Sequence, residues 1–168
     1  MMSVRTLSAA LLAASLAGCA GSVSAPTVIQ PLTMDQKAAL HLADVSADAA
    51  DGVAMSDGDF GIICQKVKSY IQAQSPGAFT DPASPGTALK MKIHFTRFDR
   101  GNAFARAMLI GLGQIVIEAT VTLENGNGAT VAQYKVAKDF AIGGVIGATT
   151  TVDDVEDGFA KSVATVVK

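Results

Sequence analysis

The chain has no tryptophan, few aromatic residues and few charges for its length. Of its 168 residues, 5% are aromatic and 17% are charged, and the formal net charge is -2. A protein that binds nucleic acid usually carries a basic face and aromatic side chains on which bases stack. The composition therefore argues against a nucleic-acid-binding protein, and we expect no nucleic acid among its partners. Hydrophobic residues make up 49% of the chain, which predicts a folded core.

The sequence also lacks the common catalytic and metal-binding motifs. It contains no HExxH, GxSxG, CxxC or P-loop pattern. Its two histidines, His41 and His94, have no carboxylates at ligand spacing, so we expect them to be ordinary surface residues. The acidic run at 153–157 lacks the alternating spacing of a calcium loop and suits the start of a helix better. We therefore expect no cofactor, no metal site and no catalytic residue.

Long apolar runs are absent, and the one at the N-terminus is short. Residues 1–18 combine a single positive charge at Arg5, an apolar stretch over 7–16 and an end of small residues. This pattern predicts a secretory signal peptide. A membrane-spanning helix would need about 20 apolar residues, more than this segment offers.

Cysteine is scarce, and the first of the two cysteines carries the most specific motif in the chain. The stretch LAGC, which ends at Cys19, resembles the bacterial lipobox. The resemblance implies a lipidated Cys19 thiol, cleavage before Cys19, and anchoring by palmitate-type acyl chains, several of which hold stably where one does not. Ala20 stands where an aspartate would favour inner-membrane retention, so the resemblance implies the outer membrane with the domain facing the periplasm. An ordinary secretory cleavage site with an incidental cysteine is the alternative.

The rest of the chain divides into a tether and one domain. Residues 19–34 contain two prolines and no charge, which is typical of a flexible tether behind the lipidated cysteine. We therefore expect a signal peptide at 1–18, the lipidated cysteine and tether at 19–34, and a periplasmic domain at 35–168. Cys64 lies on the apolar face of a predicted helix, where we expect a buried, unreactive thiol.

Hydrophobic periodicity predicts the elements of the domain. Helical spacing marks 60–71 and 150–168, and Asp57 or Asp59, Thr151 and Asp154 suit the two helix N-termini. The segment NGNG at 125–128 predicts a tight hairpin. The order β-α-β-β-β-α predicts an α+β fold of two layers, in which two helices cover a mostly antiparallel sheet of about four strands. The four strands, recognised by alternation of apolar and polar residues, are expected at 39–45, 88–98, 114–124 and 129–140.

Two glycine-rich apolar stretches, 99–117 and 140–151, flank the hairpin strands at the same end. Their glycines disfavour a simple helix and permit close backbone packing or a bulge. Because one stretch precedes the outgoing strand and the other follows the return strand, we expect the two to be neighbours. They belong either to the domain's own core or to an apolar patch for a partner or for self-association. The candidate partner-binding residues are Arg106, Gly111, Gly113, Gly143, Gly144 and Gly147.

The segment RFDRGNAFARAMLIGLGQIVIEATVTLENGNGATVAQYKV resembles a family of small bacterial envelope lipoproteins that carry a domain of unknown function. Arg106, Gly111 and Gly113 occupy the Arg and Gly-x-Gly places of the family pattern, whereas Gln114 stands where a small residue is expected. The resemblance spans about 39–167 and implies no established enzyme activity. It implies a fold similar to the curli-secretion lipoprotein and to lipoprotein activators of peptidoglycan synthases, although fold does not fix function.

These observations favour one function and leave two others open. The first is a non-enzymatic outer-membrane lipoprotein that binds or assists another envelope protein through the glycine-rich patch. The second is a self-associating structural or export-accessory lipoprotein, for example one that builds a ring. The third is a small-ligand binder or enzyme that uses the same glycine-rich edge.

Overall fold

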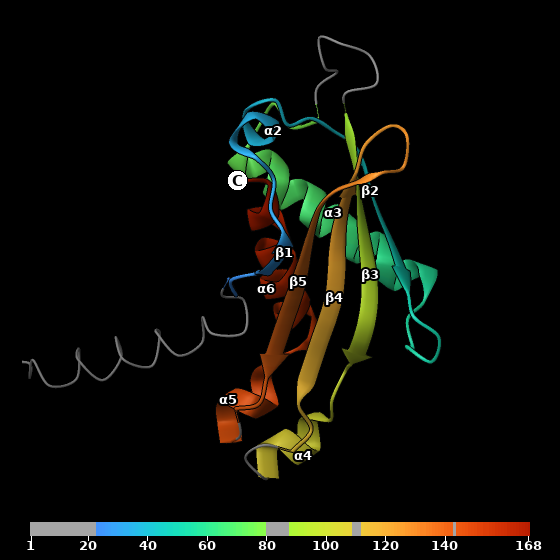
Figure 1. The fold of residues 1–168 in the computed structure, drawn as a ribbon. Helices are drawn as coiled ribbons and strands as arrows, with labels where there is room; N and C mark the ends of the chain where they lie inside the picture. The colour runs from blue at the N-terminus through green and yellow to red at the C-terminus, as the bar shows by residue number, and fades with distance from the viewer. Residues whose placement is uncertain (1–22, 80–87, 109–111, 143) are drawn as a thin grey trace, which may run out of the picture.

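The computed structural model describes residues 23–79, 88–108, 112–142 and 144–168. In this part of the chain, five strands form one mixed sheet in the order β1-β5-β4-β3-β2 (Figure 1). Neighbouring strands are antiparallel, except that β2 runs parallel to β3. The strands are β1 (Thr27–Gln30), β2 (Leu42–Ala49), β3 (Leu89–Asp99), β4 (Ile115–Glu124) and β5 (Thr130–Phe140).

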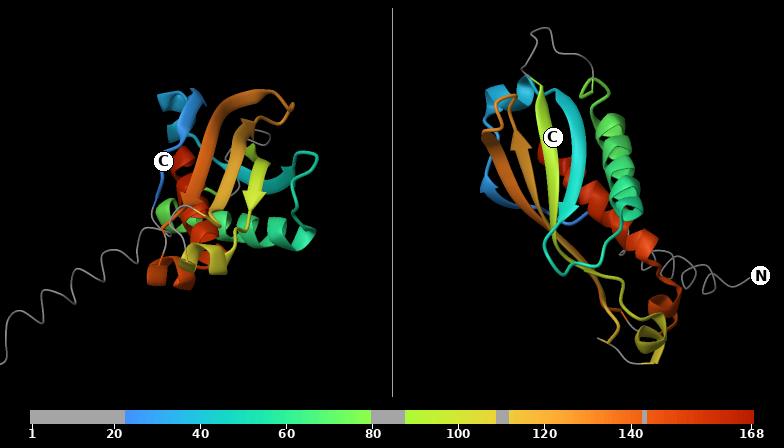
Figure 2. Two further views of the ribbon diagram at one scale, coloured as in Figure 1. Left: turned by 90° about the horizontal axis from the view of Figure 1, so that it is seen from below. Right: turned by 90° about the vertical axis from the view of Figure 1, so that its right-hand side faces the viewer.

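Two long helices, α3 (Asp57–Gln74) and α6 (Val152–Ala164), cover one face of the sheet, and no described helix covers the other (Figure 2). Each helix begins with a capping box, in which a hydroxyl and a carboxylate satisfy the first free backbone N–H groups. Ser56 and Asp59 form this box in α3, and Thr151 and Asp154 form it in α6. The shorter helical elements are α2 (Met34–Ala38), α4 (Ala103–Met108), α5 (Gly144–Thr149) and the 3-10 turn η1 (Thr165–Val167).

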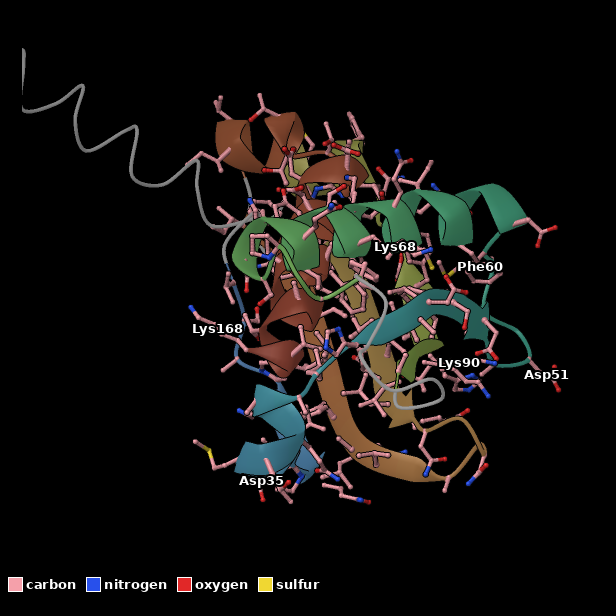
Figure 3. All side chains as sticks on the ribbon, turned by 90° about the horizontal axis from the view of Figure 1, so that it is seen from above. Asp35, Asp51, Phe60, Lys68, Lys90 and Lys168 are labelled. Atoms are coloured by element: carbon pink, nitrogen blue, oxygen red, sulfur yellow. The ribbon has the colours of Figure 1, made fainter. Side chains whose placement is uncertain are left out.

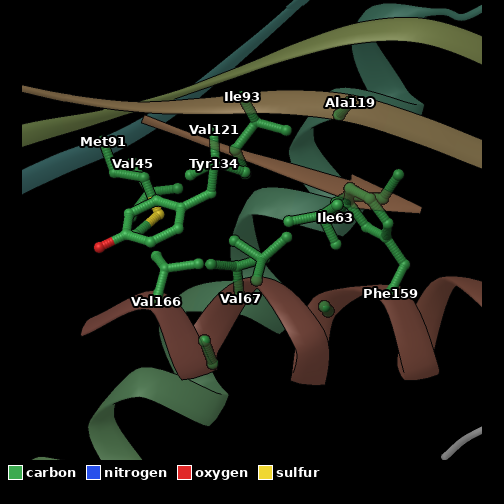
Figure 4. Close-up of a cluster of buried hydrophobic side chains, with 14 of the residues drawn as sticks. Val45, Ile63, Val67, Met91, Ile93, Ala119, Val121, Tyr134, Phe159 and Val166 are labelled. Atoms are coloured by element: carbon green, nitrogen blue, oxygen red, sulfur yellow. The ribbon is translucent and has the colours of Figure 1, made fainter. Parts of the chain in front are cut away.

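The hydrophobic core lies between the sheet and these two long helices (Figure 4). Alternate side chains of β3 and β4 point towards the helices, as the period of two in the sequence predicted. The ring of Phe95 in β3 lies 5.5 Å from the ring of Phe159 in α6, and both are fully buried. The alternation in the predicted strands is confirmed, because their alternate apolar residues are buried: Leu89, Met91, Ile93, Phe95, Ile115, Ile117, Ala119, Val121, Leu123, Ala132, Tyr134, Val136 and Phe140.

The folded unit begins earlier than predicted. Residues 27–30 pair with β5 as an edge strand, Leu32 is buried, and the Ser24 amide donates a hydrogen bond of 2.7 Å to Ser162 Oγ in α6. The prediction of a flexible tether is therefore wrong for residues 24–34. Its two prolines flank the strand instead of interrupting it, and an edge strand tolerates proline. The predicted signal peptide and Cys19 lie outside the described residues.

The predicted α+β, two-layer fold is confirmed in outline and corrected in its sheet. The sheet contains β1 in addition to the four predicted strands, and the first predicted strand extends to Ala49. The pairing of β2 with β3 is parallel because α3 connects them as a crossover helix. His41, expected inside that strand, lies just before it.

Candidate functional site

The two glycine-rich stretches meet at one end of the sheet, as the hairpin geometry predicted. Helix α4 follows β3 and helix α5 follows β5, and the two helices pack together (Figure 1). The expectation that the glycines disfavour a simple helix here is wrong for α5, which contains two of them. A glycine costs a helix only about 1 kcal/mol, which contacts between neighbouring elements readily offset. Gly144 and Gly147 lie within α5, whereas Gly111 and Gly143 lie outside the described residues.

Large apolar side chains cover this end of the molecule and face solvent. We call this set the apolar tip. The segments that carry these side chains have almost no charge, since Arg106 is the single charged residue in 101–114 and 141–150. An exposed apolar surface of this kind usually marks a contact with another protein or with a membrane. The tip consists of Phe104 (75% exposed), Met108 (67%), Leu112 (52%), Ile142 (37%) and Val145 (82%).

Arg106 holds the tip together from the inside. We predicted a partner contact for it, but the structure leaves only 3% of Arg106 exposed. Its guanidinium donates from Nη1 to the Gly113 carbonyl at 2.7 Å and from Nη2 to the Thr150 carbonyl at 3.1 Å. One cation therefore links the segment before β4 to the end of α5. Buried arginine is used in this way because its planar fork can serve two acceptors at once.

Two glycines allow the backbone to close beneath the tip. Gly101 and Gly113 both have positive φ, +63° and +67°. A Cβ at Gly113 would lie 2.3 Å from the Asn102 carbonyl oxygen, and one at Gly101 would lie 2.3 Å from the Gly113 carbonyl oxygen. Gly113, which we predicted as a partner-binding residue, thus has a structural reason to be glycine.

The side chains that form the surface of the tip were not among the candidates from the sequence. The glycines and the arginine drew attention to the right segments, but the apolar residues beside them form the exposed surface. The available signal was the spacing of Phe104, Met108 and Leu112 at every fourth position, with no counterpart stripe of charge.

A second group of charged residues joins the two long helices. Lys66 in α3 lies 2.6 Å from Asp153 and 3.9 Å from Glu156 in α6. Burial raises the pKa of Glu156, and the nearby Lys66 ammonium opposes that shift. The Tyr70 hydroxyl donates to Asp157, which also pairs with the Lys161 ammonium at 2.7 Å. These contacts stabilise the packing of α3 against α6.

Cys64 has the environment of a structural thiol. It is partly buried, and it packs against the hydrophobic core as predicted. Burial raises the pKa of the Cys64 thiol, which lowers the fraction of nucleophilic thiolate at neutral pH.

The uncovered face of the sheet is polar and gently hollowed. A depression of about 590 Å³ is lined by Thr27, Thr96, Glu118 and Lys135, among others. Elsewhere on this face, His94 Nδ1 lies 2.6 Å from a carboxylate oxygen of Asp48. Within the described ranges, no group of three or more His, Cys, Asp or Glu side chains could hold a metal ion. The same residues include no helix long and apolar enough to cross a bilayer.

Solved structures with a similar fold include two of PelC from Paraburkholderia phytofirmans, both described as dodecamers. One, a single-substitution variant, shares 14% identity and a TM-score of 0.52, with 87% of this chain and 96% of that chain covered. The other shares 15% identity and a TM-score of 0.52, with 84% and 96% covered. A chain from Caulobacter crescentus CB15, named only provisionally as a lipoprotein, matches at 16% identity and a TM-score of 0.38, over 72% and 82% of the two chains.

No curated protein matches the chain. A family match covers the greater part of it, from α2 to the first residue of α5, and includes Arg106 and the whole β3–β5 meander. By this match over residues 34–144, the chain belongs to the DUF4410 family, described as a domain of unknown function.

Proposed function

We propose that this protein is a non-enzymatic lipoprotein of the bacterial outer membrane, whose domain faces the periplasm and assembles with envelope proteins, copies of itself included. The observation that carries the proposal is the LAGC stretch ending at Cys19, five residues before the folded domain begins at Ser24. The charged groups that join α3 and α6 pair with one another, as structural ion pairs do, which favours a binding role over catalysis. The likeness to the curli-secretion lipoprotein and to synthase activators stays a prediction.

Self-association is supported by the fold and by the two sides of the domain. PelC, which shares this fold, forms dodecamers. β1 lies at an edge of the sheet with Val28 55% and Ile29 49% exposed, and edge strands offer unpaired backbone groups to a neighbour. α3 packs on β2, the strand at the opposite edge of the sheet, and Ile62 of α3 is 49% exposed. Two different apolar sides suit a head-to-tail interface, the kind that closes into a ring.

Replacing the lipidated cysteine tests the anchor. Cys19→Ser is expected to abolish incorporation of an alkyne-labelled palmitate in cells and to move the protein from the membrane to the soluble periplasmic fraction after a carbonate wash. The reason is that stable anchoring needs several acyl chains, and the serine hydroxyl cannot receive them by the thiol route. Cys64→Ser is the matched control and should label and fractionate as the unmodified protein does. Undiminished labelling of the Cys19→Ser protein would overturn the lipoprotein assignment.

A charge on the edge strand tests assembly. Ile29→Lys is expected to weaken self-association of the purified lipoprotein in detergent by roughly tenfold or more, because an unpaired ammonium is costly to bury in an interface. Native mass spectrometry over a concentration series measures the change. Val145→Lys, at a more exposed position on the apolar tip (82% against 49% for Ile29), should leave the oligomer distribution unchanged. A monomer at every concentration of the unmodified protein would contradict self-association, and an oligomer indifferent to Ile29→Lys would exclude the β1 edge.

A further inference from the structure

We propose that the apolar tip inserts into the lipid surface that anchors Cys19, so that the domain is attached to the membrane at two points. This inference rests on the proposed lipidation for its geometry. The occupant of the tip is then the acyl region of the bilayer, and the sides of the domain remain available for proteins.

The first argument is the short distance along the chain between the lipid and the fold. Ser24 is fixed by its hydrogen bond to Ser162 Oγ, so Cys19 lies five positions along the chain from a rigid point on α6. Five residues span at most about 17 Å when fully extended. A lipidated Cys19 therefore keeps the domain against the bilayer, and some part of its surface must face the lipid.

The second argument is that this length matches the position of the tip. Val152 begins α6 and follows the tip directly, and Ser162 lies ten residues further along the helix. Ten helical residues rise by about 15 Å. The segment from Ser24 to Cys19 is therefore long enough to bring Cys19 to the level of the start of α6, next to the end of α5, at the lower end of the molecule in Figure 1.

The third argument is the contrast between the two ends of the domain. The end opposite the tip carries charged groups, including Asp35, Lys90 and the C-terminal Lys168 (Figure 3). At the tip end, the single charged residue in 101–114 and 141–150 is Arg106, which is buried and bonded to backbone carbonyls. Charged side chains resist transfer into lipid, whereas exposed Phe, Met, Leu, Ile and Val favour it. The tip end is therefore the end that a bilayer accepts.

The chemistry of the tip also distinguishes lipid from a protein partner. Protein interfaces concentrate Trp, Tyr, Phe, Met and Arg in the centre and surround them with a rim of hydrogen-bonding polar and charged groups. The exposed side chains of the tip are Phe, Met, Leu, Ile and Val. Its arginine, Arg106, is buried and bonded to a backbone carbonyl. A surface that offers apolar side chains without charged groups suits a fluid apolar phase.

The absence of tryptophan from the chain provides a direct test. Phe104→Trp places a single indole on the tip, and Met34→Trp places one on the 81% exposed position of α2 as the control. Both are made in the lipidated protein, reconstituted into vesicles of phosphatidylethanolamine and phosphatidylglycerol. We expect a blue-shifted emission, and quenching by brominated acyl chains, for Phe104→Trp and neither for Met34→Trp. An unshifted, unquenched Phe104→Trp would overturn the proposal.

A second measurement separates the tip from the anchor and from assembly. The Cys19→Ser protein is expected to co-float with the same vesicles weakly, and adding Phe104→Ser and Val145→Ser should reduce that binding at least tenfold, with Met34→Ser unchanged. If the tip substitutions dissociate the oligomer in lipid-free solution and leave flotation unaltered, the tip is a protein interface and the proposal fails. If cells do not lipidate Cys19 but the tip still binds vesicles, the proposed anchor fails and the lipid-binding tip stands.

Discussion

Gly113→Ala is expected to unfold the apolar tip while the sheet stays folded. Alanine at a φ of +67° costs about 1–2 kcal/mol, and its Cβ would lie 2.3 Å from the Asn102 carbonyl and 2.9 Å from Ala105 Cβ. The clashing oxygen belongs to the backbone, so a side-chain rotation cannot relieve the clash. We expect a combined loss of roughly 3 kcal/mol or more in the local stability of α4 and the segment before β4.

Hydrogen exchange resolves this effect, because a peripheral element opens without global unfolding. A loss of about 3 kcal/mol corresponds to a roughly 100-fold faster exchange of protected amides in α4 and α5. The amides of β3 and β4 should exchange as before. Gly128→Ala is the matched control, since Gly128 also has a positive φ, +79°, but no atom lies within 4 Å of its added Cβ. Unchanged protection of α4 in the Gly113→Ala protein would contradict the close packing seen beneath the tip.

The parts of the fold that could be predicted from the sequence are those with strict periodicity. The alternation over β3, β4 and β5 identified the buried face because side chains of a strand point alternately to its two faces. The helices α3 and α6 were recognised from their apolar stripes and from capping residues such as Asp59 and Thr151. These signals are local, and each is repeated several times within one element.

The features that escaped prediction depend on contacts between distant segments. Thr27–Gln30 become a strand because β5 supplies a partner more than one hundred residues later, and no local pattern marks them. The burial of Arg106 depends on the carbonyl of Thr150, which lies 44 residues away. In the same way, α5 forms although it contains Gly144 and Gly147, because it packs on α4. Local propensity fails where tertiary contacts decide.

The division between the tip and the rest of the domain also explains how one small protein could serve two kinds of contact. The tip lies at one end, and the apolar residues Val28, Ile29 and Ile62 lie on the sides. In the proposed arrangement the end meets lipid and the sides meet neighbouring copies. Substitutions in one region should therefore change one kind of binding and leave the other intact.

Arg106→Ala is expected to lower the stability of the protein more than the loss of any exposed ion pair in the described residues would. The change removes the donors that now bind the part-buried carbonyls of Gly113 and Thr150 at 2.7 and 3.1 Å, and it leaves the Gly113 carbonyl with the Asn102 amide alone. A hydrogen bond to a charged group contributes about 1.5–3 kcal/mol, so we expect a loss of roughly 3–5 kcal/mol in stability around the tip. Arg106→Lys should recover part of this, because one ammonium cannot reproduce the two-armed geometry of the guanidinium.

Urea unfolding and hydrogen exchange together measure this loss, and vesicle flotation of the same substitution in the Cys19→Ser protein tests its consequence for lipid binding. Arg100→Ala is the control: Arg100 pairs with Asp59 at 2.7 Å, but its side chain is 52% exposed, and such a pair is worth at most about 1 kcal/mol. We expect Arg106→Ala to reduce flotation at least tenfold, because α4 with Phe104 and α5 with Val145 are then no longer held together. We expect Arg100→Ala to leave flotation unchanged. If both substitutions change the hydrogen exchange of the α4 and α5 amides equally, the buried guanidinium does not hold α4 to α5.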